Sequence, residues 1–350
     1  MRKISKVGLG VAGVAVLLLT QATAAHADHA AEGADIVGIG SDTIQYAADF
    51  LADGDYQGNP GFNAAGARVL NFDATGDASG KLTAGATVVL RGGNFPVVRP
   101  NGSGGGLTFF TQTDTAATHK VQFVRSSRKP SKTEDDRAVA NGWGGLRCYQ
   151  LGLDGLRIAV SKTTATNAGT AGISAADLKK IYSSPPQITT WGQVTGYNGP
   201  NAGATIVPIL PPATSGTEQF FIAQIGLTEA QLRTTAEGLV RAEEHDPSAI
   251  QGNANAIAPF STARLVMIHN GYFNGGTAQD PITLQSGGSA FDVTRPVYFI
   301  VRNSEINTSW NKALFAPGGF LSQSFLAQPL IEDAAGFTYQ YADAGLCHTA

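Results

Sequence analysis

Residues 211–221, PPATSGTEQFF, join a segment typical of a β-strand to a segment typical of a helix. Residues 205–210 (TIVPIL) are apolar and rich in β-branched side chains, whereas residues 220–225 (FFIAQI) can continue as a helix. Ser215 and Thr217 place hydroxyl groups at the predicted helix start, where the first backbone N–H groups have no partner within the helix. This turn therefore predicts an anion-binding helix N-terminus, and its alternative is an ordinary serine N-cap.

A second unit of the same kind lies near the start of the chain. Residues 34–40 (ADIVGIG) predict a strand that ends in glycine, and residues 43–51 (TIQYAADFL) predict a helix with an apolar stripe. Ser41 and Asp42 lie between them, and both residue types cap helices well. Two strand, turn and helix units with polar side chains at the helix start are therefore expected.

Two further segments bring groups that suit an anion. Residues 101–106 (NGSGGG) place glycines around Ser103, so their backbone N–H groups could form an anion nest; the alternative is a flexible hairpin or linker. Residues 121–124 (VQFV) predict a strand that ends at residues 125–128 (RSSR). These arginines are the expected positive charges for a buried anion, unless they only face solvent.

The N-terminal segment has the features of a secretion signal. Three basic residues precede the apolar run 7–19, and residues 25–27 (AHA) provide a cleavage site, which predicts a signal peptide over residues 1–27. The run has about 13 residues, fewer than the roughly 20 that cross a bilayer. No cysteine follows it for lipid attachment, so we expect an exported chain without a stable membrane anchor, located in the periplasm or outside the cell.

The net charge and the cysteine content limit the possible partners and predict a covalent cross-link. Removal of the signal lowers Lys plus Arg from 24 to 21 against 27 Asp plus Glu, a net charge of −6, which argues against nucleic acid as a partner. The two cysteines, Cys148 and Cys347, predict one disulfide in an exported chain, with two buried thiols as the alternative.

The remaining polar clusters predict neither a metal site nor a catalytic centre. The histidines lack paired metal-ligand spacing and are interpreted as surface or structural residues; those considered are His119, His245, His269 and His348. Residues 243–246 (EEHD) are interpreted as a solvated turn before Pro247, with acid–base machinery as the alternative. Neither Ser103 nor Ser215 has a neighbouring base in the sequence, and we expect no cofactor.

Several other elements are predicted from apolar patterns and caps. We expect strands at residues 155–160, 256–260 and 296–301, helices that begin at Ser174 and Thr228, and a helical tail over residues 310–336.

Four of these segments, in this order, resemble the PstS-like phosphate-binding proteins of ABC transporters. They are residues 38–43 (GIGSDT), 101–106 (NGSGGG), 125–128 (RSSR) and 214–217 (TSGT). Residues 178–182 (LKKIY) with 188–191 (ITTW), and residues 295–297 (RPV), add to the similarity, which covers most of residues 34–305.

The resemblance implies a type 2 periplasmic-binding-protein fold of the α/β class, with two lobes, two crossover strands and a cleft between the lobes. Lobe I would comprise residues 28–157 plus 297–350, and lobe II residues 158–296. The residue patterns and the resemblance together predict a ligand site at Ser41, Asp42, Thr43, Gly102, Ser103, Gly104, Arg125, Ser126, Ser127, Arg128, Thr214, Ser215, Gly216 and Thr217.

The sequence departs from the family pattern at two places. The family's Arg-x-Asp-Gly before Ser-Gly-Thr is here residues 211–214 (PPAT), and its Ser-Asp-Ala-Pro is here residues 126–129 (SSRK). The family's arginine and proton-accepting aspartate are therefore missing. We hypothesise that Asp42 accepts the proton of phosphate and that Arg125 or Arg128 supplies the positive charge.

The expected function is that of a non-enzymatic, monomeric solute-binding protein. It would capture an inorganic oxyanion, phosphate in particular, by lobe closure and deliver it to an ABC permease. Two alternatives stay open: a secreted hydrolase that uses Ser215 or Ser103 with a distant base, and an extracellular module that binds cell-wall or other polymers.

Overall fold

A computed structural model describes residues 31–65, 68–74, 87–92, 96–114 and 118–348. The predicted signal peptide, residues 1–27, lies outside this part of the chain. No helix in the described ranges combines the length and apolar character that crossing a membrane requires.

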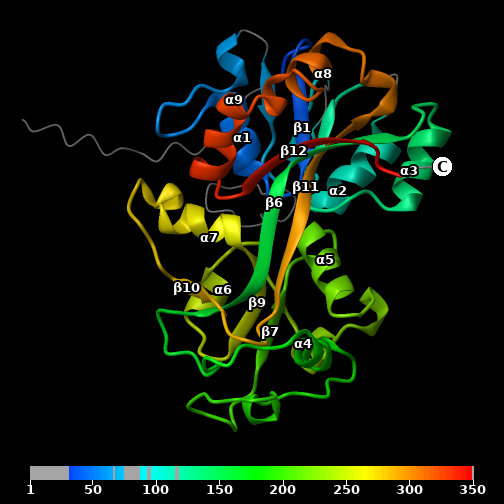
Figure 1. Cartoon of the computed structure of the whole chain (residues 1–350). Helices are drawn as coiled ribbons and strands as arrows, with labels where there is room; N and C mark the ends of the chain where they lie inside the picture. Colours follow the sequence, from blue (N-terminus) through cyan, green and yellow to red (C-terminus); the bar gives the residue numbers. More distant parts are fainter. Residues whose placement is uncertain (1–30, 66–67, 75–86, 93–95, 115–117, 349–350) are drawn as a thin grey trace, which may run out of the picture.

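Two lobes share one ten-stranded sheet, whose strands follow the order β2-β1-β5-β11-β6-β9-β7-β8, with β10 and β12 also paired to β6 (Figure 1). The strands are β1 (Ile36–Gly40), β2 (Val69–Asn71), β3 (Thr87–Val88), β4 (Val97–Val98), β5 (Phe123–Ser126), β6 (Leu146–Ser161), β7 (Val207–Leu210), β8 (Val240–Arg241), β9 (Ala256–Ser261), β10 (Ile282–Leu284), β11 (Asp292–Arg302) and β12 (Thr338–Leu346). The helices are α1 (Gln45–Asp53), α2 (Gly102–Thr108), α3 (Lys132–Ala140), α4 (Ala175–Tyr182), α5 (Gly216–Gln224), α6 (Ser248–Gln251), α7 (Thr262–His269), α8 (Ser309–Leu314) and α9 (Ser324–Gln328).

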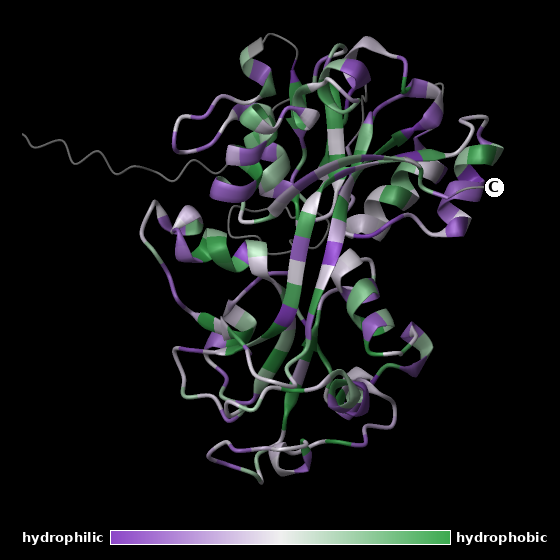
Figure 2. Cartoon of the chain, in the orientation of Figure 1, coloured by the Kyte–Doolittle hydropathy of each residue, from purple (hydrophilic) through white to green (hydrophobic). Residues whose placement is uncertain are grey.

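The long strands β6 and β11 run through both lobes as an antiparallel pair. They are the two crossover strands of the expected type 2 periplasmic-binding fold, which the structure confirms. Polar residues interrupt both strands where the lobes meet (Figure 2), and there Asp154 of β6 lies opposite Arg295 of β11. The strand predicted at residues 155–160 is thus only one end of a much longer element.

The first lobe contains β1, β2 and β5, which pair in parallel, with α1, α2 and the C-terminal helices around them. Its core includes Phe50, Phe123, Phe299 and Phe315, all buried. The helical tail predicted after residue 310 forms α8 and α9 on this lobe.

The second lobe contains β7, β8 and β9 with α4, α5 and α6. Tyr182 of α4, Phe221 of α5 and Trp191 are buried in its core. Ser174 caps α4 by accepting from the backbone N–H of Asp177, as the sequence predicts. The helix predicted at Thr228 is wrong, because only a 3₁₀ turn, Glu229–Gln231, forms there.

The glycine-rich segment 101–106 is neither a loop nest nor a flexible hairpin, because α2 begins at Gly102. Glycine lowers helix propensity by about 1 kcal/mol relative to alanine, so packing must favour it here. A Cβ on Gly106 would lie 2.7 Å from the Cα of Gly40, and one on Gly102 would lie 2.6 Å from the carbonyl oxygen of Thr214. The glycines therefore let α2 pack closely on β1 and on the second lobe.

The predicted disulfide is confirmed. Cys148 of β6 and Cys347, just after β12, are bonded with an S–S distance of 2.02 Å across a sequence separation of 199 residues. The bond attaches the C-terminal end of the chain to a crossover strand.

Candidate anion-binding site

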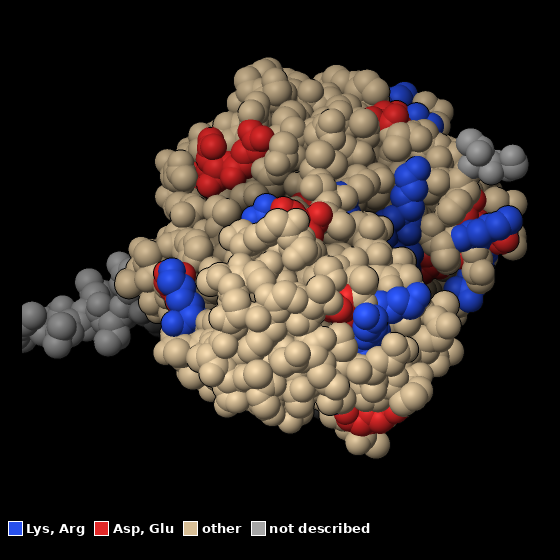
Figure 3. All heavy atoms as spheres, turned by 60° about the horizontal axis from the view of Figure 1, so that its bottom comes forward, with Lys and Arg blue, Asp and Glu red and all other residues tan. Residues whose placement is uncertain are grey.

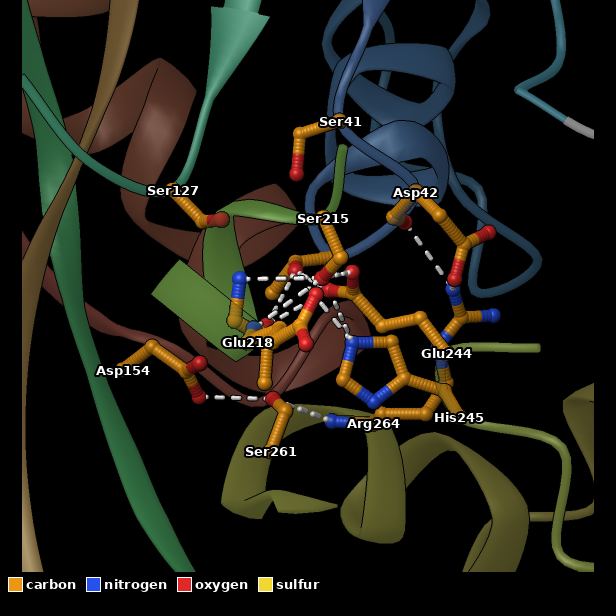
Figure 4. A network of polar contacts seen from close by, with 12 residues as sticks. Ser41, Asp42, Ser127, Asp154, Ser215, Glu218, Glu244, His245, Ser261 and Arg264 are labelled. Atoms are coloured by element: carbon orange, nitrogen blue, oxygen red, sulfur yellow. Dashed lines mark hydrogen bonds and ion pairs between the residues drawn. The ribbon is translucent and has the colours of Figure 1, made fainter. Parts of the chain in front are cut away.

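The starts of α1, α2 and α5 meet where the two lobes touch, as the sequence predicts for these three segments. Figure 4 shows Ser41 and Asp42, before α1, near Ser215 at the start of α5. The backbone N–H of Gly104 in α2 donates to the carbonyl oxygen of Thr214, before α5, at 3.0 Å. Thr43 and Thr217 lie across the same boundary with their hydroxyl oxygens 3.2 Å apart. The lobes are therefore in direct contact around these polar groups.

Ser215 caps α5 and also contributes to the site. Its hydroxyl oxygen accepts from the backbone N–H groups of Thr217 and Glu218, at 3.0 and 3.2 Å, and its hydroxyl hydrogen is donated to a carboxylate oxygen of Glu244. The ordinary capping role and the binding role proposed for this serine are thus compatible.

The carboxylate of Glu244 lies at the centre of the site. Its Oε1 accepts from the hydroxyl of Thr217 at 2.6 Å and from the hydroxyl of Thr43, and its Oε2 accepts from Ser215. The Nε2 of His245 lies 2.9 Å from Oε1. Because a carboxylate only accepts hydrogen bonds, this nitrogen carries the proton. Three hydroxyls from both lobes and one imidazole therefore converge on a single anionic group.

This arrangement contradicts the interpretation of residues 243–246 as a solvated turn, and it shows that His245, interpreted as a surface or structural residue, is not on the surface. Glu244 is 5% exposed and His245 is 8% exposed, and both side chains point into the lobe boundary. Burial raises the pKa of Glu244, but the charge and hydrogen bond of His245, together with Arg295 and Ser215, outweigh it and hold the pKa well below its usual range. The carboxylate is therefore ionised despite its burial.

The two neighbouring carboxyl groups, those of Glu243 and Glu218, have pKa values above their usual range. Burial raises the pKa of Glu243 to about 7, against a hydrogen bond from Asn101, and burial raises that of Glu218 to about 7, against Arg241. Glu244 thus differs from its neighbours because it has many more donors.

Two buried arginines supply positive charge to the site. The Nη2 of Arg295 donates to the hydroxyl oxygen of Thr217 at 2.7 Å and to Asp154 at 2.9 Å. The Nη2 of Arg264 donates to the backbone oxygen and the carboxylate of Asp42, at 2.9 and 3.0 Å. Arg295 is 1% exposed and Arg264 is 5% exposed, so water screens these charges weakly.

The arginines predicted from the sequence point elsewhere. The guanidinium of Arg125 donates to the backbone oxygens of Phe72 and Ser41, at 2.7 and 3.3 Å. Arg128 pairs with Glu134 at 2.8 Å and also donates to Gln219 of the second lobe. Arg125 therefore supports the turn at Ser41 from behind, whereas Arg128 bridges the two lobes beside the site.

Of the serines predicted in the first lobe, Ser41, Ser103 and Ser127 lie at the candidate site, whereas Ser126 does not. Ser103 and Ser127 contact each other, with 3.2 Å between their hydroxyl oxygens, and both lie against Gly216. Ser41 is fully buried, its hydroxyl points toward the cluster in Figure 4, and the described residues offer this oxygen no hydrogen-bond partner. Ser126 instead donates to the backbone oxygen of Arg128.

Asp42, the proposed proton acceptor, is held by Arg264 at the edge of the cluster. Burial raises the pKa of its carboxyl group, and the charges of Arg264 and His245 oppose this effect. Within the described ranges, no group of three or more His, Cys, Asp or Glu side chains could hold a metal ion.

Sequence reasoning missed four residues of this site: Glu244, His245, Arg264 and Arg295. Glu244 and His245 belong to an acid-rich cluster in the sequence, residues 243–246, and this clustering was the available signal. Arg295 begins a segment already noted for its similarity to the family. Arg264 gave no signal, because a single arginine in an apolar helix usually extends its charge to solvent.

The fold is that of the two-lobed periplasmic-binding proteins. The chain belongs to the PBP superfamily, since a family model described as "PBP superfamily domain" matches residues 64–316, well over half of the sequence. No curated protein matches the sequence.

Solved structures with the same fold include several phosphate-binding proteins. A protein from Clostridium perfringens, assigned as a phosphate ABC transporter substrate-binding protein and solved with bound phosphate, is 14% identical, with a TM-score of 0.55 over 87% of this chain and 100% of that one. An ABC-type phosphate transport receptor from Vibrio cholerae is 17% identical, with a TM-score of 0.53 over 87% and 100%. A human phosphate-binding apolipoprotein is 15% identical, with a TM-score of 0.53 over 87% and 91%. At these identities the likeness shows the fold.

Proposed function

We propose that the protein is an exported solute-binding protein that captures an inorganic oxyanion, phosphate in particular, between its lobes. The observation that carries this proposal is the convergence of the Thr43, Ser215 and Thr217 hydroxyls on one ionised carboxylate. A carboxylate presents two oxygens that share one negative charge, as does one edge of a tetrahedral oxyanion. Donors arranged for the first group therefore suit the second.

The positive charge in this proposal comes from Arg264 and Arg295 instead of Arg125 or Arg128, which the sequence favours. Each helix N-terminus contributes only about half a charge, so an arginine is needed to balance the anion. Asp42 keeps its proposed role as the acceptor for a phosphate proton. Ser41, Ser103 and Ser127 line the first-lobe side of the proposed site.

Lobe closure is the proposed mechanism of capture, with no covalent chemistry. We assign residues 28–157 plus 297–350 to lobe I and residues 158–296 to lobe II, so that β6 and β11 act as the hinge. On the face shown in Figure 3, charged residues occur in small separate groups, many with both signs. Attraction of an anion would therefore be local to the site.

Export through the segment 1–27 and delivery to an ABC permease complete the proposal. The fold shared with phosphate-binding proteins of ABC transporters supports it. We expect a monomer that needs no cofactor.

The geometry favours binding over hydrolysis. In a hydrolytic triad, histidine lies between serine and carboxylate and takes the serine proton. Here Ser215 donates directly to Glu244, and His245 contacts that same carboxylate. Ester turnover abolished by replacing Ser215 would nevertheless reverse this conclusion, and retention on cell-wall polymer without any anion effect would favour the polymer-binding alternative.

Calorimetric titration with phosphate and sulfate tests the proposed function. Ser215→Ala removes one hydrogen bond to a charged group and should weaken phosphate binding by roughly 10- to 100-fold. Ser174→Ala is a matched control, because this serine also caps a helix but lies away from the site. Equal phosphate affinities in the unmodified protein, Ser215→Ala and Ser174→Ala would contradict the proposal. Absence of anion binding to the unmodified protein and to every variant would contradict it as well.

A further inference from the structure

Glu244 occupies the donors that an incoming anion would need. The hydroxyls of Thr43, Ser215 and Thr217 all donate to its carboxylate. A hydroxyl has one hydrogen to donate. An external oxyanion cannot receive these three hydrogen bonds while Glu244 holds them.

The same carboxylate links the two lobes. Glu244 follows β8 in the second lobe, and Thr43 begins the α1 segment in the first lobe, 201 residues away in sequence. Bound solutes of two-lobed proteins make contacts of this kind, to both lobes at once. Glu244 therefore makes the contacts that a bound anion would make.

The charge around the site is already distributed over internal groups. Arg295 is paired with Asp154, Arg264 is paired with Asp42, and His245 contacts Glu244. A further anion beside an ionised Glu244 would bring two like charges together in a buried setting, which is strongly unfavourable. An anion that replaces the carboxylate avoids this cost.

We propose that the Glu244 carboxylate is the resident ligand of the oxyanion site, and that an external oxyanion binds by displacing it. Glu244 thereby determines specificity, because only anions that compete with a fully hydrogen-bonded carboxylate can enter. This inference rests on the proposed anion-binding function. It also implies that the closed arrangement of the lobes does not require a solute.

Substitution of Glu244 should open the site to external anions. Glu244→Gln keeps the shape of the side chain and removes its charge, so phosphate should bind roughly tenfold or more tightly than to the unmodified protein, the scale of one hydrogen bond to a charged group. Asp246→Asn is the matched control: it makes the same exchange in the same turn, but Asp246 accepts from Ser248 instead of from the site, at 2.7 and 2.8 Å. The control should leave phosphate affinity unchanged.

Glu244→Ala supplies a chemical-rescue test. Removing the carboxylate leaves its donors unpaired, so the melting temperature should fall, and acetate should restore it by occupying the vacated position. Acetate should not stabilise the unmodified protein. If this variant does not fold without added anion, recovery of the folded protein on refolding in acetate gives the same readout.

Hydrogen–deuterium exchange of the unmodified protein tests displacement directly. Phosphate should increase exchange in residues 242–247, because the turn leaves the site, while exchange at the start of α5 decreases. Decreased exchange in both segments would overturn displacement.

The outcomes separate this inference from the proposed function. Phosphate binding that is weaker in Glu244→Gln and absent in Glu244→Ala would preserve the anion site but overturn the inference, since Glu244 would then act as a direct ligand. No phosphate or sulfate binding to any of these proteins, with acetate rescue intact, would remove the proposed oxyanion function while keeping the carboxylate as an internal ligand. If the proteins show neither anion binding nor acetate rescue, both the inference and the proposed function are overturned.

Discussion

At the scale of single residues, Arg295 has a central position at the lobe boundary. Its guanidinium pairs with Asp154 across the two crossover strands and donates to Thr217, a member of the anion site. Asp154 in turn accepts from Ser261 at 2.6 Å, at the start of α7. The Arg295–Asp154 pair therefore connects the two crossover strands with the candidate site and with the start of α7.

Replacing Arg295 should destabilise the protein strongly. Arg295→Gln leaves Asp154 as a buried charge without its ionic partner, which typically costs about 3–5 kcal/mol of unfolding free energy. Urea denaturation measures this loss. Arg157→Gln is the matched control, because Arg157 forms a partly exposed pair with Asp292 between the same two strands and should cost less than about 1 kcal/mol. Similar losses of unfolding free energy in the two variants would show that the Arg295–Asp154 pair stabilises the protein no more than the partly exposed pair does.

At the scale of elements, the helix starts are positioned by close packing as much as by capping. The first residue of α5 is Gly216, and a Cβ at this position would lie 2.3 Å from the hydroxyl oxygens of both Ser103 and Ser127. The start of the second-lobe helix therefore rests directly on two first-lobe serines. A side chain at this position would displace these serine hydroxyls or move the lobes apart.

Gly216→Ala should consequently weaken anion binding and stability together. Helix propensity alone would favour alanine by about 1 kcal/mol, but its methyl group must displace the hydroxyls of Ser103 and Ser127 or shift the lobes. Thermal unfolding and phosphate titration measure the two effects. Gly252→Ala is the control, since Gly252 has a negative φ and open space around the position of a Cβ. Improved stability with unchanged affinity in Gly216→Ala would contradict this account of the interface.

At the scale of the whole molecule, the crossover strands and the disulfide define how the chain is held together. β12 pairs with β6, and the Cys148–Cys347 bond fixes its end beside Leu146, whose backbone oxygen accepts from the N–H of Cys347 at 2.8 Å. The C-terminal strand thus covers the first-lobe end of a crossover strand.

Removing the disulfide should lower stability without changing the site. The double substitution Cys148→Ser with Cys347→Ser opens a loop of 199 residues, for which the chain-entropy relation gives at most about 5 kcal/mol. Denaturation of both proteins under identical conditions measures the loss of unfolding free energy. Under conditions in which both proteins are folded, their phosphate affinities should be the same. An unaltered unfolding midpoint would mean that strand pairing alone holds the C-terminus.

The sequence by itself determined the features that depend on neighbouring residues. It predicted the strand, turn and helix units at Ser41 and Ser215, the cap at Ser174 and the single disulfide, because caps and apolar periodicity act over a few residues and two cysteines allow one pairing. The two crossover strands were implied only by the resemblance to the PstS-like family, since local patterns predicted just one end of β6. The order of these units also indicated the two-lobed fold.

Only the tertiary structure decided which charges enter the site. Arg264, Arg295 and Glu244 reach it because segments far apart in the chain pack together, and Arg125 leaves it because backbone oxygens nearby take its donors. An acidic turn is normally best solvated in water, but four donors make burial of Glu244 favourable. Such a balance depends on the number of partners in space, which local sequence patterns do not contain.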